Sequence, residues 1–167
     1  FKADPPVDFT AQMALADFDK AQALLKRHFP NYGLYPATKE INAIFKGIRD
    51  EIKAKGDEIN VNNFAVFLRR AFAQVGEGHT CSQIPYEDFP HYSLKLTENK
   101  ILLDGNLFKL GKKPEVLTID GRDASEVLDE LANLICIDGG NKTSARSFAA
   151  VEFSHLNYAI TQNRTTK

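Results

Sequence analysis

The spacing of apolar residues changes near the middle of the sequence, and this change most constrains the fold. Up to Val75 the apolar residues recur at three- and four-residue steps, as in helices that bury one face. From Glu77 onward, short apolar runs are separated by turn residues, which is typical of strands. The sequence predicts an α+β protein: a three-helix cap at residues 1–82 and a small α/β module with hairpin strands at residues 83–167.

Three helices are predicted in the first half. The first spans residues 11–28 and ends near Pro30, because proline disfavours a helical conformation at the residue before it. Thr38 is expected to cap the second helix, which stops at a break over residues 53–57, and Asn60 is expected to cap the third. The third helix has the clearest apolar stripe. Its members are Val61, Phe64, Phe67, Leu68, Ala71, Phe72 and Val75.

Short apolar runs in the second half predict strands. Residues 80–84 could form one short strand, and residues 115–119 another. Residues 93–96 and 101–103 flank a polar four-residue turn, which is a hairpin signal.

Two further helices are predicted in this half. Asp123 is followed three residues later by Glu126, so the pair resembles a capping box at a helix start, and residues 138–141 end that unit. A last helix is expected over roughly residues 144–158. One face of this helix would carry Phe148, Val151, Glu152 and His155.

Composition excludes several classes of protein. The chain has 21 Lys and Arg residues and 22 Asp and Glu residues, so its net charge is −1, without the basic field that nucleic acids or anionic membranes require. No run of apolar residues is long enough to span a membrane. We expect no metal site and no cofactor, because no nucleotide-binding, zinc-binding or calcium-binding motif is present.

The two cysteines do not form a known short motif. Cys81 and Cys136 lie 55 residues apart, which excludes a zinc ribbon and a thioredoxin-type site. We expect two separate free thiols, because a disulfide requires their Cα atoms to lie within about 7 Å of each other. One bridge is the alternative that the sequence leaves open.

His79 is the main candidate for chemistry. It lies in the turn GEGHT at residues 76–80, between the third helix and a predicted strand, where two glycines permit a tight backbone. An imidazole in such a loop suits proton transfer, although a turn histidine bonded to the backbone is the structural alternative. Cys81 could pair with His79 as a dyad or half a metal site only if the segment bends.

Other candidates have simpler structural explanations. Ser154 and His155 are adjacent on a helix, so their side chains diverge and cannot form a nucleophile and base pair. Ser144 or Thr143, after a glycine turn, could lie at an oxyanion-binding helix start, but a plain N-cap role is the simpler interpretation.

Several segments, in this order, resemble the N-terminal region of tail-specific (C-terminal processing, tricorn-like) serine peptidases. They are HFPNY at residues 28–32, FAQV at 72–75, GEGHT at 76–80, EVLTIDG at 115–121 and SEVL at 125–128. The family often carries GDGHT at the third of these segments and an ING turn followed by a helix at the last two. The resemblance covers about residues 12–140.

The sequence departs from the family pattern in two mild ways and one serious way. Glu77 replaces the usual Asp, and Asp120 replaces the usual Asn. In the family, a helix and further strands separate the glycine-containing segment from the catalytic serine. Too few residues lie between residues 137–141 and Ser144 to form these elements. We therefore expect this chain to lack the nucleophile and to be inactive alone.

The resemblance implies a function for the GEGHT turn. In some family members the histidine of this turn serves as the base of a Ser-His-Glu arrangement, whereas others use Ser-Lys. His79 would then be a possible base, with Glu77, Gly78 and Thr80 as binding residues at a groove lined by residues 75–80. The implied partners are a polypeptide substrate and a missing C-terminal catalytic domain, with no nucleic acid and no membrane span, in a periplasmic or secreted location.

Two alternatives belong to other functional classes. The chain could be a stand-alone module that binds a peptide or carbohydrate without catalysis, or a thiol enzyme that uses Cys81 and His79. If His79 is a base for a group on another domain, we expect it to be partly exposed at the rim of a concavity between the helical half and the strands, with Glu77 beside it.

Overall fold

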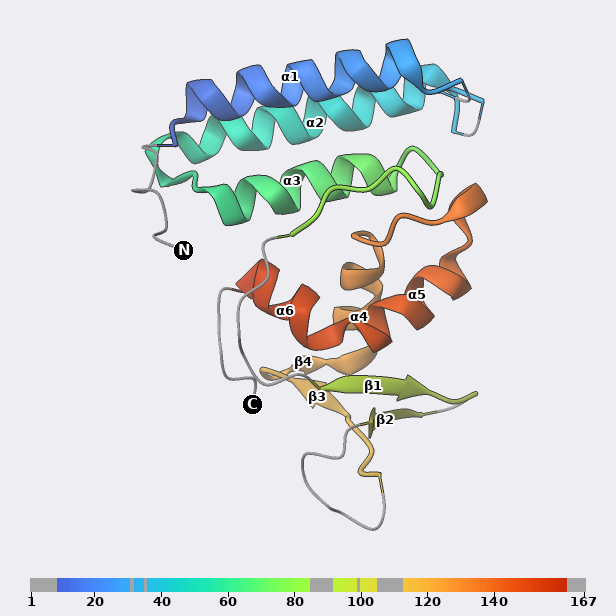
Figure 1. The fold of residues 1–167 in the computed structure, drawn as a ribbon. Coiled ribbons are helices and arrows are strands. Elements are labelled where there is room, and N and C mark those ends of the chain that lie inside the picture. Colours follow the sequence, from blue (N-terminus) through green and yellow to red (C-terminus); the bar gives the residue numbers. More distant parts are fainter. Residues whose placement is uncertain are drawn as a thin grey trace, which may run out of the picture.

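The computed structural model describes residues 9–30, 32–34, 36–84, 92–98, 100–104 and 113–161. Its fold is α+β, as the sequence predicts. Three N-terminal helices lie together, three further helices lie beneath them, and short strands lie beyond those (Figure 1).

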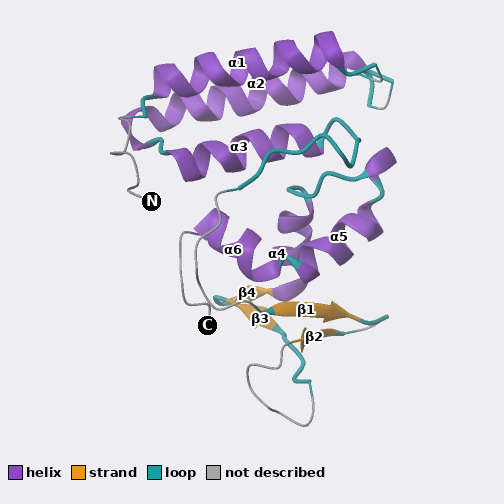
Figure 2. Ribbon diagram, in the orientation of Figure 1, coloured by secondary structure: helices purple, strands orange, loops and turns teal. Residues whose placement is uncertain are grey.

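The first three helices run in alternating directions (Figures 1 and 2). They are α1 (Ala11–His28), α2 (Thr38–Lys55) and α3 (Val61–Ala73), and the short 3-10 turn η1 (Gly56–Glu58) precedes α3.

The caps of these helices differ in one place from the prediction. Asn60 caps α3, as expected, because its side chain accepts from the N–H of Asn63 at 3.0 Å. The cap of α2 is Ala37 rather than Thr38, because Ala37 has an extended backbone and Thr38 is already the first helical residue. The Glu40 carboxylate accepts from the N–H of Ala37 at 3.2 Å.

The apolar faces of α1, α2 and α3 meet in a first core. The rings of Phe18 and Phe45 pack with centroids 5.4 Å apart, and Phe67 is 7% exposed. The stripe of α3 faces this core from Phe64 onward, whereas Val61, its first predicted member, is 54% exposed. The buried members of the first core are Ala14, Phe18, Leu25, Ile41, Phe45, Ile48, Ile52, Ile59, Phe64, Phe67, Ala71 and Val75.

The predicted hairpin is confirmed. Strands β1 (Ser93–Leu96) and β2 (Ile101–Asp104) pair antiparallel, with Leu94 opposite Leu103. The predicted strand over residues 115–119 is shorter. It consists of a single bridge from Glu115 to Leu102 and of β3 (Thr118–Ile119).

A second small hairpin joins β3 to β4 (Arg122–Asp123). Its turn residues Asp120 and Gly121 have φ angles of +51° and +80°, the left-handed conformation that Asp and Gly tolerate in two-residue hairpin loops.

The predicted strand at residues 80–84 is wrong. Ser82 on this segment donates through its hydroxyl to the carbonyl oxygen of Ala65 on α3 at 3.5 Å, so the segment lies along a helix rather than beside a strand. Without a neighbouring strand, its extended backbone cannot form a ladder.

The helices of the second half are α4 (Ala124–Ala132), α5 (Lys142–Val151) and α6 (Phe153–Thr161), with a 3-10 turn, η3 (Asp138–Gly140), between the first two. Asp123 caps α4 as predicted, since it accepts from the N–H groups of Ser125 and Glu126 at 2.8 and 3.1 Å.

The single helix predicted for residues 144–158 is two helices. They separate at Glu152, and the cap of α5 is Asn141, which accepts from the N–H of Ser144 at 3.0 Å, rather than Ser144 or Thr143. The buried face also differs from the expected one. Phe148 and Val151 are exposed, and α5 instead buries Ala145, Ala149 and Ala150.

These helices pack with β1 and β3 around a second core. Its buried residues include Leu94, Ile119, Leu128, Phe153 and Leu156. The buried members of the first core end at Val75, and those of the second begin at Ile84. The division at residues 82 and 83 falls between them and stays a prediction.

Candidate functional site

Residues 76–80, here called the His79 loop, connect α3 to the second half of the chain. α3 ends at Ala73, and Gly76 follows with a φ of +74°, a left-handed conformation that glycine adopts without steric cost. The carbonyl oxygen of Gly76 accepts a hydrogen bond from the N–H of Gly139 at 3.0 Å. The start of the loop is thereby fixed to η3.

Asp138 holds the middle of the His79 loop. The backbone N–H of Gly78 donates to Oδ1 of Asp138 at 2.7 Å. A Cβ atom on Gly78 would lie 3.3 Å from that oxygen, so a larger residue would press on the contact. The sequence predicted only a turn here. Asp138 was missed because its partner lies 60 residues away.

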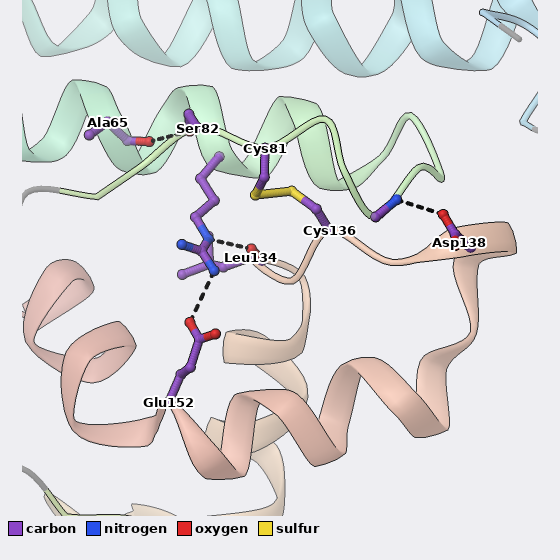
Figure 3. The surroundings of a disulfide bond; sticks show 9 residues. Ala65, Cys81, Ser82, Leu134, Cys136, Asp138 and Glu152 are labelled. Carbon is purple, nitrogen blue, oxygen red and sulfur yellow. Dashed lines mark hydrogen bonds and ion pairs between the residues drawn. A yellow bond between two sulfur atoms is a disulfide. The ribbon is translucent and has the colours of Figure 1, made fainter.

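A disulfide joins the end of the His79 loop to the second half (Figure 3). Cys81 and Cys136 are bonded, with their Cα atoms 5.8 Å apart, so the expectation of two free thiols is wrong. The fold brings the exits of α3 and α4 together, which the spacing of the two residues does not reveal. With its sulfur in this bond, Cys81 is not the nucleophile of a thiol enzyme.

His79 is 90% exposed, and Glu77 is beside it as predicted. Nδ1 of His79 lies 3.0 Å from Oε1 of Glu77, whose side chain is 21% exposed. A carboxylate only accepts hydrogen bonds, so this geometry assigns the proton of a neutral imidazole to Nδ1. The Nε2 lone pair is then available to accept a proton.

Glu77 is held as a carboxylate by its own loop. The hydroxyl of Thr80 donates to it and lowers its pKa below the ordinary value of 4.5. Burial opposes this shift, and hydrogen bonds from the backbone and ring of His79 and from the backbone of Thr80 add to it. The negative charge beside His79 is therefore stable at neutral pH.

A cavity of about 430 Å³ lies beside the His79 loop. Its wall comprises Arg69, Gly78, His79, Cys81, Ser82, Gln83, Ile135, Cys136, Ile137, Asp138, Phe148 and Glu152. The residues come from α3, from residues 78–83, from the connection between α4 and α5, and from α5 with its C-terminal cap. The cavity therefore lies between the helical half and the helices of the second half. We had expected it between the helical half and the strands.

Arg69 crosses from α3 to the second half and was not foreseen from the sequence. Its side chain is 13% exposed, and Nε donates to the carbonyl oxygen of Leu134 at 2.8 Å. Nη2 donates to Oε2 of Glu152 at 3.1 Å, and Figure 3 shows both acceptors below the disulfide. Arg69 is not a member of the apolar stripe of α3, so the sequence carried no local signal for this contact.

The serine and threonine residues that could act as nucleophiles do not gather around His79. Ser82 lines the cavity, but its hydroxyl points to Ala65 (Figure 3). Thr143 and Ser144, at the start of α5, are outside the residues that line the cavity. Ser154 is buried on α6 and accepts from the N–H of Tyr92 at 3.4 Å. The structure does not place Ser144 or Ser154 with His79.

Three side chains at the site offer metal-ligand atoms. Glu77, His79 and Asp138 each place one such atom within 4.8 Å of the other two. All three groups already make hydrogen bonds inside the site: Glu77 and His79 pair with each other, and Asp138 accepts from the N–H of Gly78.

Comparison with known proteins found no matching family model, no matching curated sequence and no matching solved structure. Within the described part of the chain, every helix is too short or too polar to cross a membrane.

Proposed function

We propose that this chain is the N-terminal, non-nucleophilic part of a tail-specific-protease-like serine peptidase, and that it helps to form the peptide-binding cleft. One observation carries the proposal: the ring of His79 is 90% exposed while its Nδ1 lies 3.0 Å from Oε1 of Glu77. A histidine held by a carboxylate through one nitrogen, with the other facing outward, has the arrangement of a general base.

The exposure of His79 fits a base whose nucleophile comes from elsewhere. Nε2 would accept the proton of a serine hydroxyl as the oxygen attacks a peptide carbonyl, and would then return it to the departing amine. Glu77 would fix the tautomer and stabilise the imidazolium that forms between these steps. Under this proposal the serine would come from a part of the protein outside residues 1–167.

The cavity beside the His79 loop supports a role in peptide binding. Gly78 and His79 line it, whereas Thr80 lines a separate hollow beside α1. A polypeptide lying in the cavity would pass the imidazole, so Gly78 would bind substrate while His79 reacts.

The disulfide supports an extracytoplasmic location. Disulfides persist in the periplasm and outside cells, whereas thiol buffers keep cytosolic cysteines reduced. The bond between Cys81 and Cys136 is therefore consistent with the export that the family resemblance implies.

The test compares the chain with its longer gene product. The 167-residue chain should not cleave a fluorogenic peptide, whereas the longer product should cleave it and should lose at least about a hundredfold in kcat through His79→Ala. Glu77→Gln should lower kcat less and leave KM almost unchanged. His28→Ala, on α1 and away from the cavity, is the control.

Two results would contradict the proposal. One is peptide cleavage by the 167-residue chain alone, and the other is unchanged cleavage by the longer product carrying His79→Ala. If the longer product cleaves nothing while the chain binds peptides or carbohydrates, the binding module without catalysis is the better account.

A further inference from the structure

The disulfide lies at the point where the His79 loop meets the second half of the molecule. Cys81 is two residues after His79, and Cys136 is two residues before Asp138. The chain has only these two cysteines, so this is its only possible internal disulfide. It connects directly the two segments that form the candidate site.

Both cysteines lie at the wall of the cavity. Cys81 is exposed and Cys136 is half-buried, and both line the cavity of about 430 Å³. Thiol–disulfide exchange requires a thiolate to reach one of the two sulfur atoms. The cavity gives a small reductant that access without unfolding of the chain.

The disulfide is also outside both cores. Neither cysteine belongs to the buried residues of the first core or of the second. Breaking the bond therefore removes a connection between the halves while both sets of packed apolar side chains stay intact. The Arg69 contacts to Leu134 and Glu152 still join α3 to the second half.

Among the residues that the structure describes, two hydrogen bonds would remain between the His79 loop and η3. They are the contact from Gly78 to Asp138 at 2.7 Å and the contact from Gly139 to Gly76 at 3.0 Å. Both join exposed or half-exposed residues, where water competes for the donor and the acceptor. Without the covalent bond, the loop and η3 can separate.

We propose that the Cys81–Cys136 disulfide is a thiol–disulfide exchange site, at which a dithiol reductant releases the His79 loop from η3. A thiolate of the reductant attacks Sγ of Cys81, the bond between the two cysteines breaks, and Cys136 leaves as a thiolate that takes up a proton. The second thiol of the reductant, as thiolate, then attacks the mixed disulfide and frees Cys81, which is also protonated. The reductant ends as a disulfide, having passed on two electrons and two protons.

The release changes the position of His79 rather than its pairing. The contact between His79 and Glu77 lies inside the loop, so reduction leaves it unbroken. The contacts to Asp138 and Gly139 lie between segments and are the ones that open. If the proposed peptidase function also holds, the reduced form keeps its base but no longer holds it at the cavity.

The experiment treats the folded 167-residue chain with dithiothreitol in the absence of denaturant. Alkylation by iodoacetamide, read by mass spectrometry, should show two free thiols within minutes. Hydrogen exchange at the amides of Gly78 and Gly139 should become at least about tenfold faster, while amides in α1 and α2 keep their rates. The helical circular dichroism signal should remain.

The double variant Cys81→Ser, Cys136→Ser is the matched control. It should show the same fast exchange at Gly78 and Gly139, and dithiothreitol should change nothing further. Three results would overturn the proposal: a disulfide that resists dithiothreitol until denaturant is added, loss of the helical signal in the reduced chain or the variant, or unchanged exchange after reduction. No readout measures peptide cleavage, so this proposal and the proposed function can fail separately.

Discussion

The guanidinium group of Arg69 donates through Nε to the backbone oxygen of Leu134 at 2.8 Å and so joins α3 to the segment that follows α4. The same side chain forms an ion pair with Glu152 between α5 and α6. One residue of the helical half thus satisfies two acceptors in the other half. The wall of the cavity beside His79 includes both Arg69 and Glu152, so this contact also shapes the candidate site.

Arg69→Met should lower the free energy of unfolding by about 1–3 kcal/mol, because the carbonyl of the buried residue Leu134 and a carboxylate lose their charged donor while the aliphatic packing is kept. Urea denaturation measures the change. Arg122→Met is the control, since its pair with Glu130 is 54% and 44% exposed. It should cost less than about 1 kcal/mol, as exposed ion pairs contribute little. Equal losses in the two variants would contradict this role for Arg69.

Phe67→Ala should lower the free energy of unfolding by about 3–5 kcal/mol, because the ring is 7% exposed in the first core and its removal leaves a cavity. Phe148→Ala on α5 is a matched control. Its ring is 51% exposed, and the loss should stay below about 1 kcal/mol. A loss below about 1 kcal/mol for Phe67→Ala would show that the stripe of α3 does not stabilise this chain.

Local signals in the sequence predicted local structure well. The apolar stripe of α3, the Asp123 cap of α4 and the hairpin of β1 and β2 each depend on residues only a few positions apart. Such patterns depend only on residues close together in the chain, so a single sequence reveals them.

Contacts between distant segments were the ones that the sequence could not reveal. The disulfide, the anchor at Asp138 and the crossing Arg69 each join residues more than 50 positions apart. The pairing of His79 with Glu77 was predictable, because both lie in one five-residue loop. The surroundings of that pair required the fold.

Gly78→Ala should destabilise the chain by about 1 kcal/mol or more, because the added methyl group would lie 3.3 Å from Oδ1 of Asp138 and weaken the hydrogen bond to it. Gly47→Ala provides the opposite case. Gly47 is inside α2 with no atom within 4 Å of an added Cβ, so alanine should stabilise the helix by about 0.5–1 kcal/mol. Thermal unfolding of both variants tests this, and a loss of stability in both would contradict it.

Glu77→Gln should reduce the sensitivity of the chain to acid. The pKa of Glu77 is lower in the folded chain than its ordinary value of 4.5, mainly through the hydroxyl of Thr80. A carboxyl with a lowered folded pKa stabilises the fold above its unfolded pKa, and this stabilisation is lost as the pH falls through the folded value. The stability difference between the native chain and Glu77→Gln should therefore be constant above about pH 5.5 and shrink below about pH 4.5.

Urea denaturation between pH 7 and pH 3 measures this stability difference, and Glu98→Gln in the β1–β2 turn corrects for the change in net charge. A difference that stays constant to pH 3 would mean that the Thr80 and His79 contacts do not favour the carboxylate, and that Glu77 is not the charge that orients His79.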